Sequence, residues 1–415
     1  MKRKLKIIVI GLGSAGDVHP NVGLALELRK RGHEVLFVAP AIFRQLTQSL
    51  GLEFVEVVSE DEYLSAIRDP DLWHPTRSLS ALARHFVLPV MRAVFEIIEK
   101  THEAGRTVVA APGTAFGARI AQEKLGVPLA TIHLQPIMLR SALRPACFGF
   151  PDIAAHLPPS LRRLYFRMTD RWIVDPCFAG PTNAFRATLG LPAVRRLFDW
   201  IHSPALVIGL FPDWFAPTAT DWPPNVALTG FPLWDEREVH TPSPAVEKFL
   251  TAGDPPLVFT AGSAMLHAKD FFCVSAEVCK ASGRRGILLT RYPEQLPAEL
   301  PEGVRHFGYV PFSELLPRSA ALVHHGGIGT TAQAIAAGLP QLIVPNTHDQ
   351  PDNAVRVRRL GLGEFLLPRA YTKVRVLQKL ERLLRPAIKE DCRKRATIMA
   401  GTRSVEMASN LIEQL

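Results

Sequence analysis

A stretch rich in histidine and glycine in the C-terminal third of the chain has residue types that bind phosphate. It reads His324-His325-Gly326-Gly327-Ile328-Gly329-Thr330-Thr331. The preceding residues, 321–324, form an apolar run typical of a buried strand, and 330–338 are small residues typical of a helix that ends at a glycine. The first amides of a helix lack internal acceptors, and hydroxyl and imidazole groups can donate to oxygen. We predict a phosphate site here; the alternative is a tight turn with two buried structural histidines.

Asp349 and Gln350 follow this turn and complete a pattern that resembles a known family. The pattern is similar to the donor-binding signature of family 1 glycosyltransferases, which include the UDP-glycosyltransferases and sterol glucosyltransferases. The resemblance covers nearly the whole chain, and segments 68–73 and 202–233 are most similar to the rhamnosyltransferase chain of rhamnolipid synthesis. It implies an α/β protein of GT-B fold, in which two Rossmann-like, doubly wound domains face a cleft.

The resemblance also implies a role for each residue of the donor site. Ser263 and His325 match groups that bind the diphosphate, and Tyr309 matches an aromatic residue that stacks on the base. Asp349 and Gln350 match the pair that contacts the sugar hydroxyls. The predicted donor-binding residues are Ser263, Tyr309, His324, His325, Gly327, Gly329, Thr330, Gln333, Asp349 and Gln350.

The sequence leaves two questions about this set open: which histidine binds the phosphate, and whether Gln333 holds the ribose. His325 matches the phosphate-binding histidine by its distance to Gly327 and Gly329, but its neighbour His324 could take its place. Gln333 stands where many members of the family carry a glutamate that holds the ribose. A glutamine can still bond a hydroxyl, but the departure leaves the strength of ribose binding undecided.

A second glycine-rich turn, residues 11–16, follows the apolar run 5–10 and reads G-x-G-x-x-G, the fingerprint of dinucleotide-binding folds. An oxidoreductase dependent on NAD is therefore an alternative of another class. That fingerprint requires an acidic residue at the end of the second strand, and the run 34–39 ends without one. We therefore interpret these glycines as a tight turn that places the next residues at the predicted cleft, and not as an NAD-binding fingerprint.

Those next residues include two candidates for a general base, Asp17 and His19. The family places its base three residues before a proline, and Asp17 has this spacing to Pro20. The residues alone also allow Asp17 to be an N-cap for a helix predicted over 20–31. We predict that Asp17 is the catalytic residue and that His19 belongs to the helix start.

Short apolar runs alternate with helical stretches through both halves of the chain, which predicts parallel sheets. The predicted strands are 5–10, 34–39, 54–58, 107–111, 129–133 and 205–210, then 257–260, 286–290, 304–307, 321–324, 341–344 and 365–367. Seven prolines between 212 and 244 indicate the connection between domains. We predict an acceptor-binding domain over 1–218, a linker over 219–244 and a nucleotide-sugar-binding domain over 245–415.

Composition narrows the class of protein. The chain has 415 residues, 47% of them hydrophobic, and a net charge of +9, values ordinary for a two-domain globular enzyme with a mild preference for anionic ligands. No zinc-finger spacing or nucleic-acid motif is present, so nucleic acid is not a predicted partner. Five scattered cysteines favour reduced thiols in the cytoplasm, and no apolar run is long enough to span a bilayer.

Two surfaces allow more than one interpretation. Along 158–173, apolar residues follow one helical face and arginines another, which is typical of core packing but also suits a greasy acceptor surface. After Arg356 the chain is rich in lysine and arginine. These residues could form a solvated helical face without a further function. The alternative is a peripheral contact with the inner face of an anionic membrane.

Together these features predict an inverting, metal-independent glycosyltransferase without a cofactor. The resemblance implies dTDP-rhamnose or a UDP-hexose as the donor and, as the acceptor, a hydroxyl of a lipophilic molecule such as a hydroxy fatty acid, giving a glycolipid. Alternatives are a UDP-glucose-dependent enzyme acting on a sterol, terpenoid or other small natural product, and a non-catalytic relative that assists another enzyme. The oxidoreductase remains the rival of another class.

Overall fold

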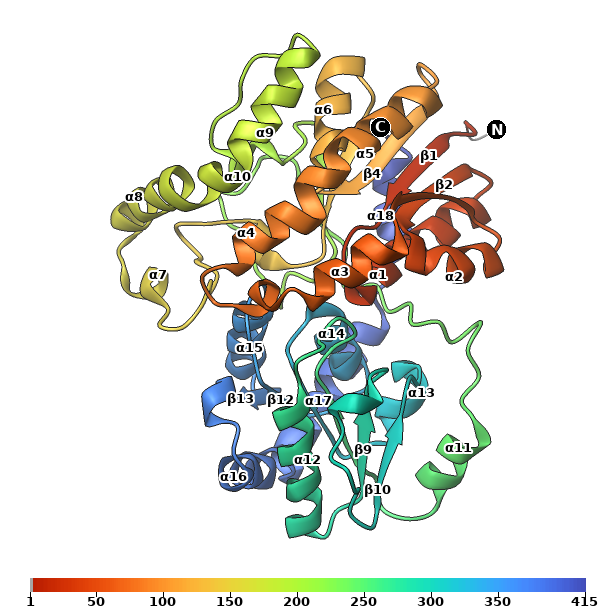
Figure 1. Ribbon diagram of the computed structural model, residues 1–415, viewed down its shortest axis with the longest axis vertical. Helices are drawn as coiled ribbons and strands as arrows, with labels where there is room; N and C mark the ends of the chain where they lie inside the picture. The colour runs from red at the N-terminus through yellow and green to blue at the C-terminus, as the bar shows by residue number, and fades with distance from the viewer. Residues whose placement is uncertain (1–2) are drawn as a thin grey trace. The chain divides into compact units, whose positions relative to one another are not determined.

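Both halves of the chain form parallel β-sheets with helices between the strands. The computed structural model describes residues 3–415 (Figure 1). The first sheet has the strand order β3-β2-β1-β4-β5-β6-β7 and the second β10-β9-β8-β11-β12-β13. Through their first six strands both follow the order 3-2-1-4-5-6 of doubly wound folds. The predicted class, two Rossmann-like α/β domains, is confirmed.

The strands of the first sheet are β1 (Lys6–Ile10), β2 (Glu34–Pro40), β3 (Glu53–Val58), β4 (Thr107–Pro112), β5 (Leu129–His133), β6 (Leu206–Gly209) and β7 (Val226–Leu228). Those of the second are β8 (Leu257–Thr260), β9 (Gly286–Leu289), β10 (Val304–Phe307), β11 (Ala321–His324), β12 (Gln341–Ile343) and β13 (Gly363–Phe365). Consecutive residues of the central strands, such as Ile7 and Ile8 of β1, are fully buried. Helices therefore cover both faces, which is why these strands are continuous apolar runs.

The helices of the first half are α1 (Ala15–Lys30), α2 (Arg44–Ser49), α3 (Glu60–Arg68), α4 (Ser78–Leu82), α5 (Leu88–Thr101), α6 (Phe116–Leu125), α7 (Ile153–His156), α8 (Pro159–Thr169), α9 (Asp175–Thr188) and α10 (Leu197–Trp200). Those of the second half are α11 (Pro244–Thr251), α12 (Lys269–Ser282), α13 (Phe312–Leu315), α14 (Ile328–Ala336), α15 (Gln350–Arg359), α16 (Lys373–Leu383), α17 (Pro386–Ala400) and α18 (Ser404–Ile412). No helix among residues 3–415 is both long and apolar enough to cross a bilayer.

Two helices begin earlier than the sequence predicts. Helix α1 starts at Ala15 and not at Pro20, because Ser14 is its N-cap and Asp17 closes a capping box at the third helical position. Pro20 lies inside the helix. Helix α14 starts at Ile328, two residues before the predicted start, since Gly327 in an extended conformation serves as its N-cap.

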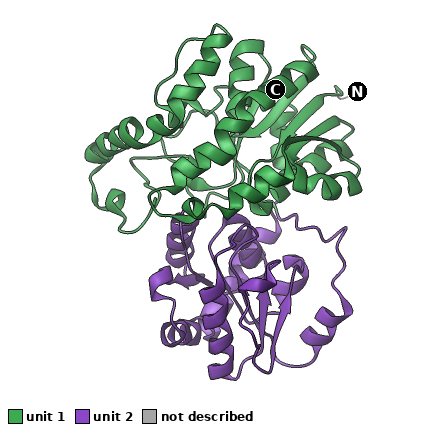
Figure 2. Ribbon diagram, viewed as in Figure 1, with its two compact units in different colours: residues 1–232, 403–415 green, residues 233–402 purple. Residues whose placement is uncertain are grey.

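The chain divides into two units that differ from the predicted ranges (Figure 2). One contains the residues up to Pro232 together with Arg403–Leu415, and the other contains Leu233–Thr402. The segment 219–244, interpreted from its prolines as a linker, contains β7, which pairs in parallel with β6 at the edge of the first sheet. The last helix, α18, belongs to the first unit.

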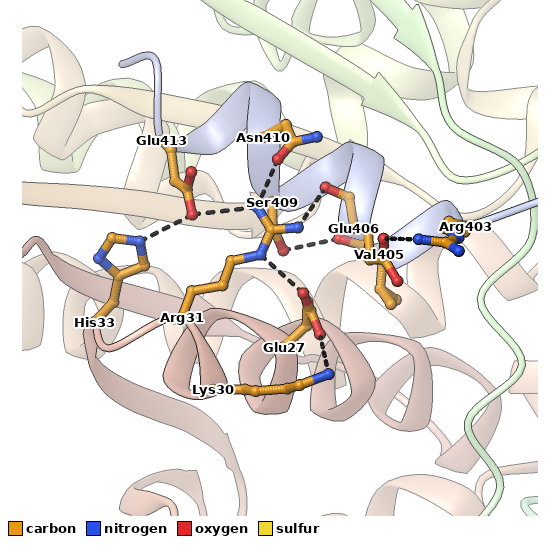
Figure 3. A network of polar contacts seen from close by, with 10 residues as sticks. All are labelled: Glu27, Lys30, Arg31, His33, Arg403, Val405, Glu406, Ser409, Asn410 and Glu413. Carbon is orange, nitrogen blue, oxygen red and sulfur yellow. Dashed lines mark hydrogen bonds and ion pairs between the residues drawn. The ribbon is translucent and has the colours of Figure 1, made fainter. Parts of the chain in front are cut away.

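An ionic network explains why α18 joins the first unit (Figure 3). The guanidinium of Arg31, at the end of α1, donates to Glu27 at 2.8 Å, to Asn410 at 2.6 Å and to Glu413 at 3.2 Å. His33 also contacts Glu413 at 3.1 Å. The contacts with Asn410 and Glu413 link residues some 380 positions apart, so these partners could not be recognised from local sequence.

The apolar stripe of residues 158–173 was predicted to face the core. In the structure, α8 and the turn after it expose this stripe and bury the opposite face. Arg162, Phe166 and Asp170 are buried, whereas Leu164 and Trp172 of the stripe are 51% and 68% exposed. The interpretation of the stripe as core is therefore wrong.

Candidate functional site

The donor-type turn lies at the centre of the second sheet. Strand β11 pairs with β8 on one side and β12 on the other, and its carboxyl end leads through residues 325–327 into α14. Strand order reverses between β8 and β11, and ligands of such sheets bind beyond the strand ends at this point. Gly326 has a φ of +95° there, and an added Cβ would lie 2.6 Å from Ile343. Only glycine fits this position.

His324 is part of the frame of this turn. Its Nδ1 accepts from the Gly326 amide at 3.1 Å, so its Nε2 carries the proton and donates to Gln341 Oε1 at 2.9 Å. Burial, with a smaller contribution from His325, lowers the pKa of His324 to about 3. Both ring nitrogens are used within the protein, so this geometry favours a structural role for His324.

His325 has the opposite character. Its imidazole lies against two glycines from different turns: an added Cβ would be 2.5 Å from Nε2 at Gly327 and 3.0 Å from it at Gly262. Its buried Nδ1 has no hydrogen-bond partner. Burial lowers the pKa of His325 to about 4, so the ring is neutral at pH 7 and has one donor and one acceptor nitrogen. A buried polar atom without a partner is costly, and a ligand could satisfy it.

The N-terminus of α14 is only partly capped. Asp349 Oδ2 accepts from the Ile328 amide at 3.2 Å and from Asn353 Nδ2 at 2.7 Å. Within residues 3–415, the next two amides, of Gly329 and Thr330, have no acceptor. Two open amides at the positive end of a nine-residue helix, beside His325, form a site suited to a phosphate oxygen.

Asp349, Gln350 and Gln333 hold the backbone around this turn. Besides the contacts of Asp349, Gln350 Oε1 accepts from the Asn346 amide at 2.8 Å, and Gln333 Nε2 donates to the carbonyl of Leu233 at 2.9 Å. Gln350 and Gln333 are buried. Their predicted contacts with the sugar and the ribose stay predictions.

Ser263 and Tyr309 lie after neighbouring strands of the same sheet. The Ser263 side chain is exposed just beyond β8, available to a ligand. The Tyr309 hydroxyl donates to the carbonyl of Asp235 at 2.7 Å, and burial raises the pKa of this phenol. The Arg291 guanidinium lies 5.1 Å from the Tyr309 ring centroid. A base that stacks on Tyr309 must use the other face or displace Arg291.

Sequence reasoning missed Arg291. It comes directly after the predicted strand 286–290, at a carboxyl end, where ligand-contacting residues gather in such sheets. This position could have identified Arg291 as a candidate ligand-contacting residue from the sequence. The contact of Tyr309 with Asp235 was not predictable, because it joins residues 74 positions apart.

In the first unit, Asp17 lies at the N-terminus of α1, after β1. Its Oδ2 accepts from the Ser14 amide at 2.9 Å and from the Ser14 hydroxyl at 3.1 Å. Its Oδ1 accepts from Gln135 Nε2 at 3.3 Å, and Gln135 follows β5. Gly13, with a φ of +116°, leaves room for this carboxylate, since an added Cβ would lie 2.5 Å from Oδ2. The glycine-rich turn is therefore built around Asp17.

Burial is the largest influence on Asp17 and raises the pKa of its carboxyl, while the bonds from Ser14 and Gln135 oppose this shift. A raised pKa makes the carboxylate a stronger base near neutral pH. His19 packs edge-on against Phe43, with ring centroids 6.4 Å apart. Sequence reasoning missed Gln135, although its place two residues after a predicted strand was a signal.

The chain is similar to glycosyltransferases over almost its whole length. Residues 7–143 match the glycosyltransferase family 28 N-terminal domain, and residues 287–413 match the C-terminal domain of erythromycin biosynthesis protein CIII-like proteins. The O-mycaminosyltylonolide 6-deoxyallosyltransferase of Streptomyces fradiae is 30% identical, over 99% of this chain and 97% of the relative. The vancomycin aglycone glucosyltransferase of Amycolatopsis orientalis is 28% identical, over 96% and 94%.

Solved structures share the fold. The glycosyltransferase of kitacinnamycin superimposes with a TM-score of 0.76 at 21% identity, with 99% of each chain covered. A spinosyn rhamnosyltransferase complexed with thymidine diphosphate superimposes with a TM-score of 0.67 at 18% identity, with 98% of this chain and 100% of the other covered. From its sequence relatives and its two parallel-sheet units, the chain belongs to the family 1 glycosyltransferases of GT-B fold, enzymes that take a sugar from a nucleotide-linked donor.

Proposed function

We propose that this enzyme transfers a hexose or deoxyhexose from a UDP- or dTDP-linked donor to a hydroxyl of a lipophilic acceptor, with inversion at the anomeric carbon. The observation that carries the proposal is the open N-terminus of α14, where two amides without acceptors lie beside His325 with its partnerless Nδ1. Such a site favours the negative charge of a diphosphate.

The proposed chemistry needs no redox step. The acceptor oxygen forms a bond to the anomeric carbon, the bond from that carbon to the diphosphate oxygen breaks, and the hydroxyl proton moves to Asp17. Charge that develops on the leaving diphosphate is stabilised by the amides of Gly329 and Thr330 and by a hydrogen bond from His325. A neutral imidazole serves here because it donates without needing an acidic medium.

The donor base and sugar are supported only by likeness. A related structure is a spinosyn rhamnosyltransferase complexed with thymidine diphosphate, which favours dTDP-rhamnose among the donors considered. Tyr309 offers a stacking face to either pyrimidine, so this residue does not discriminate uracil from thymine.

Two acceptor classes remain in the proposal. A hydroxy fatty acid follows from the resemblance to the rhamnolipid enzyme. A sterol, terpenoid or other small natural product is the second candidate, and a natural-product acceptor is favoured by relatives named as an O-mycaminosyltylonolide 6-deoxyallosyltransferase and a vancomycin aglycone glucosyltransferase. Product analysis by mass spectrometry over a matrix of donors and acceptors decides between them.

The oxidoreductase alternative meets an electrostatic obstacle in the first unit. The Ser14 amide and hydroxyl, which a dinucleotide phosphate would need in the turn after β1, are already bonded to the Asp17 carboxylate. A phosphate in that turn would face a negative charge instead of open donors.

Isothermal titration calorimetry with UDP, dTDP and NAD tests the proposal. We expect UDP or dTDP to bind, NAD not to bind, and His325→Ala to weaken nucleotide binding roughly tenfold or more, the effect of one hydrogen bond to a charged group. His324→Asn is the matched control, because its effect should appear in stability and not in nucleotide affinity. Binding of NAD alone, or full nucleotide affinity in His325→Ala, would contradict the assignment.

A further inference from the structure

Helix α8 presents its apolar side to solvent. The exposed residues Leu161, Leu164 and Met168 of α8 and Trp172 of the helical turn 170–174 that follows it recur at the spacing of one helical face, and the exposed Arg163 and Arg167 lie beside them. We call these six residues the α8 face. A surface helix normally buries its apolar side. The reversed orientation of α8 therefore requires polar contacts that hold its buried side and a function for its exposed apolar side.

The inner side is held by polar bonds. The buried Arg162 donates from Nε to the carbonyl of Ala154 at 2.7 Å, from a terminal nitrogen to that of Leu157 at 2.6 Å, and also to Ala142. The buried Asp170 accepts two bonds from Arg140 at 2.7 Å each. Because these charged groups are satisfied only in this orientation, α8 cannot rotate to bury its apolar side without leaving them unpaired.

Exposed apolar side chains concentrate around this helix. Among residues 3–415, fourteen large apolar side chains are exposed, and nine of them lie between Leu143 and Ile173. The exposed Phe148 makes an edge contact with the buried Phe166 of α8, at 6.2 Å between ring centroids. Figure 1 draws α7 and α8 together at the left edge of the first unit. Apolar patches of this kind mark interaction surfaces.

The charge around the face has one sign. Arg144, Arg163, Arg167 and Arg171 are exposed and have no carboxylate partner in the described chain. Residues 141–173 contain two acids, of which Asp170 is bound to Arg140 and Asp152 caps α7. By contrast, several cations of the basic C-terminal helices are paired, for example Lys379 with Glu364 at 2.9 Å and Arg382 with Glu364 at 3.2 Å.

We infer that the α8 face docks on the surface of an anionic lipid bilayer, a contact that goes beyond the transfer reaction and does not depend on the proposed donor or acceptor. Apolar residues with a tryptophan would enter the interface, while the arginines pair with lipid phosphates. Arg171 lies 5.4 Å from the Trp172 ring centroid, an arrangement suited to the headgroup level. A symmetric pair of chains fits this face less well, because the same arginines would meet each other.

The test uses the full-length protein and vesicle co-sedimentation. We expect binding to vesicles of phosphatidylglycerol and phosphatidylcholine, weaker binding to phosphatidylcholine alone, and weaker binding at high salt. The triple variant Arg163→Gln, Arg167→Gln, Arg171→Gln should lower the partition coefficient roughly a hundredfold or more. The double variant Leu164→Ser, Trp172→Ser should also lose binding.

A matched control removes three positive charges elsewhere, through Arg375→Gln, Arg393→Gln and Lys394→Gln on α16 and α17. It should bind vesicles like the parent. Equal loss in this control, unchanged binding in the arginine variant, or no binding by the parent overturns the inference. So does a dimer in sedimentation velocity that the Leu164→Ser, Trp172→Ser variant dissociates. If that double variant unfolds, the arginine variant decides.

Discussion

Asp17 combines two tasks in one side chain. One oxygen closes the capping box with Ser14, and the other accepts only the 3.3 Å bond from Gln135. In the proposed reaction, Asp17 would accept the proton on this more weakly bonded oxygen, Oδ1. Gln135 thus orients the proposed base, while burial strengthens it.

We expect Asp17→Asn to lower kcat roughly 10² to 10⁴-fold, the usual effect of removing a general base, because the amide keeps the shape and cannot take the proton. Nucleotide affinity should not change. His19→Ala should lose far less activity. Single-turnover transfer at saturating donor and acceptor measures both variants. An inactive His19→Ala beside an active Asp17→Asn would return the role of base to the histidine.

The adjacent histidines His324 and His325 show how environment separates identical residue types. His324 ends β11, where both its nitrogens are bonded, and His325 begins the turn, where its buried Nδ1 has no hydrogen-bond partner within residues 3–415. The buried, fully bonded state of His324 predicts that this residue makes the stability of the protein depend on pH.

Acid should destabilise the protein partly through His324. The unfolded chain protonates this imidazole below about pH 6.5, whereas the folded protein keeps it neutral down to about pH 3. Its contribution to stability is therefore full above pH 6.5 and is lost as the pH falls through that window. We expect the gap in unfolding free energy between the parent and His324→Asn to shrink by about 1.4 kcal/mol per pH unit. Urea titrations at pH 7.5 and pH 5 measure it, and a constant gap would refute the assignment.

At the scale of elements, the turn between β11 and α14 depends on the absence of side chains. Gly327 has φ −59° and ψ 144°, a conformation open to any residue, so its glycine is needed for space and not for backbone freedom. The space is filled by the His325 ring, which also packs on Gly262 at the end of the neighbouring strand β8.

Gly327→Ala is therefore a steric test of the donor turn. The new methyl would lie 2.5 Å from His325 Nε2 and must displace the ring. We expect nucleotide affinity to fall roughly 10 to 100-fold, as it would on loss of the imidazole hydrogen bond, with little change in stability. Gly401→Ala, whose Cβ would meet nothing within 4 Å, is the control. Equal calorimetric affinities in the two variants would show that His325 does not contact the nucleotide.

At the scale of the whole molecule, the C-terminal helix belongs to the first unit although the residues before it belong to the second. The Arg31 network ties α18 to α1, the helix that carries Asp17 at its other end (Figure 3). Stability of the first unit should therefore depend on the last residues of the chain.

We expect Arg31→Met to lower the unfolding free energy of the first unit by about 2 to 4 kcal/mol, because it removes the guanidinium bonds to Glu27 and Glu413. Nucleotide affinity should not change, because the proposed nucleotide site belongs to the second unit. Arg403→Met, which removes an arginine that is 78% exposed, should cost less than about 0.5 kcal/mol. Urea unfolding followed by circular dichroism compares the variants, and equal losses would mean that the network contributes little.

Much of the fold could be predicted because buried parallel strands are marked locally. β5, β8, β10 and β11 have the predicted bounds, and β5, β8 and β11 are fully buried, mostly apolar runs closed by a turn. β7 was missed, because three half-buried residues among prolines give no such signal. The starts of α1 and α14 were missed because cap geometry, and not propensity, sets them.

The sequence by itself determined the α/β class, the two glycine-rich turns and the candidates Asp17 and His325, because these depend on residue types at short spacings. Only the tertiary structure decided which histidine keeps an open nitrogen, which groups hold the Asp17 carboxylate, where α18 packs and which face of α8 is exposed. Each of these involves partners distant in the chain, such as Gln341 for His324 and Gln135 for Asp17. A local pattern records what a residue can do, whereas burial and hydrogen-bond satisfaction depend on every element packed around it.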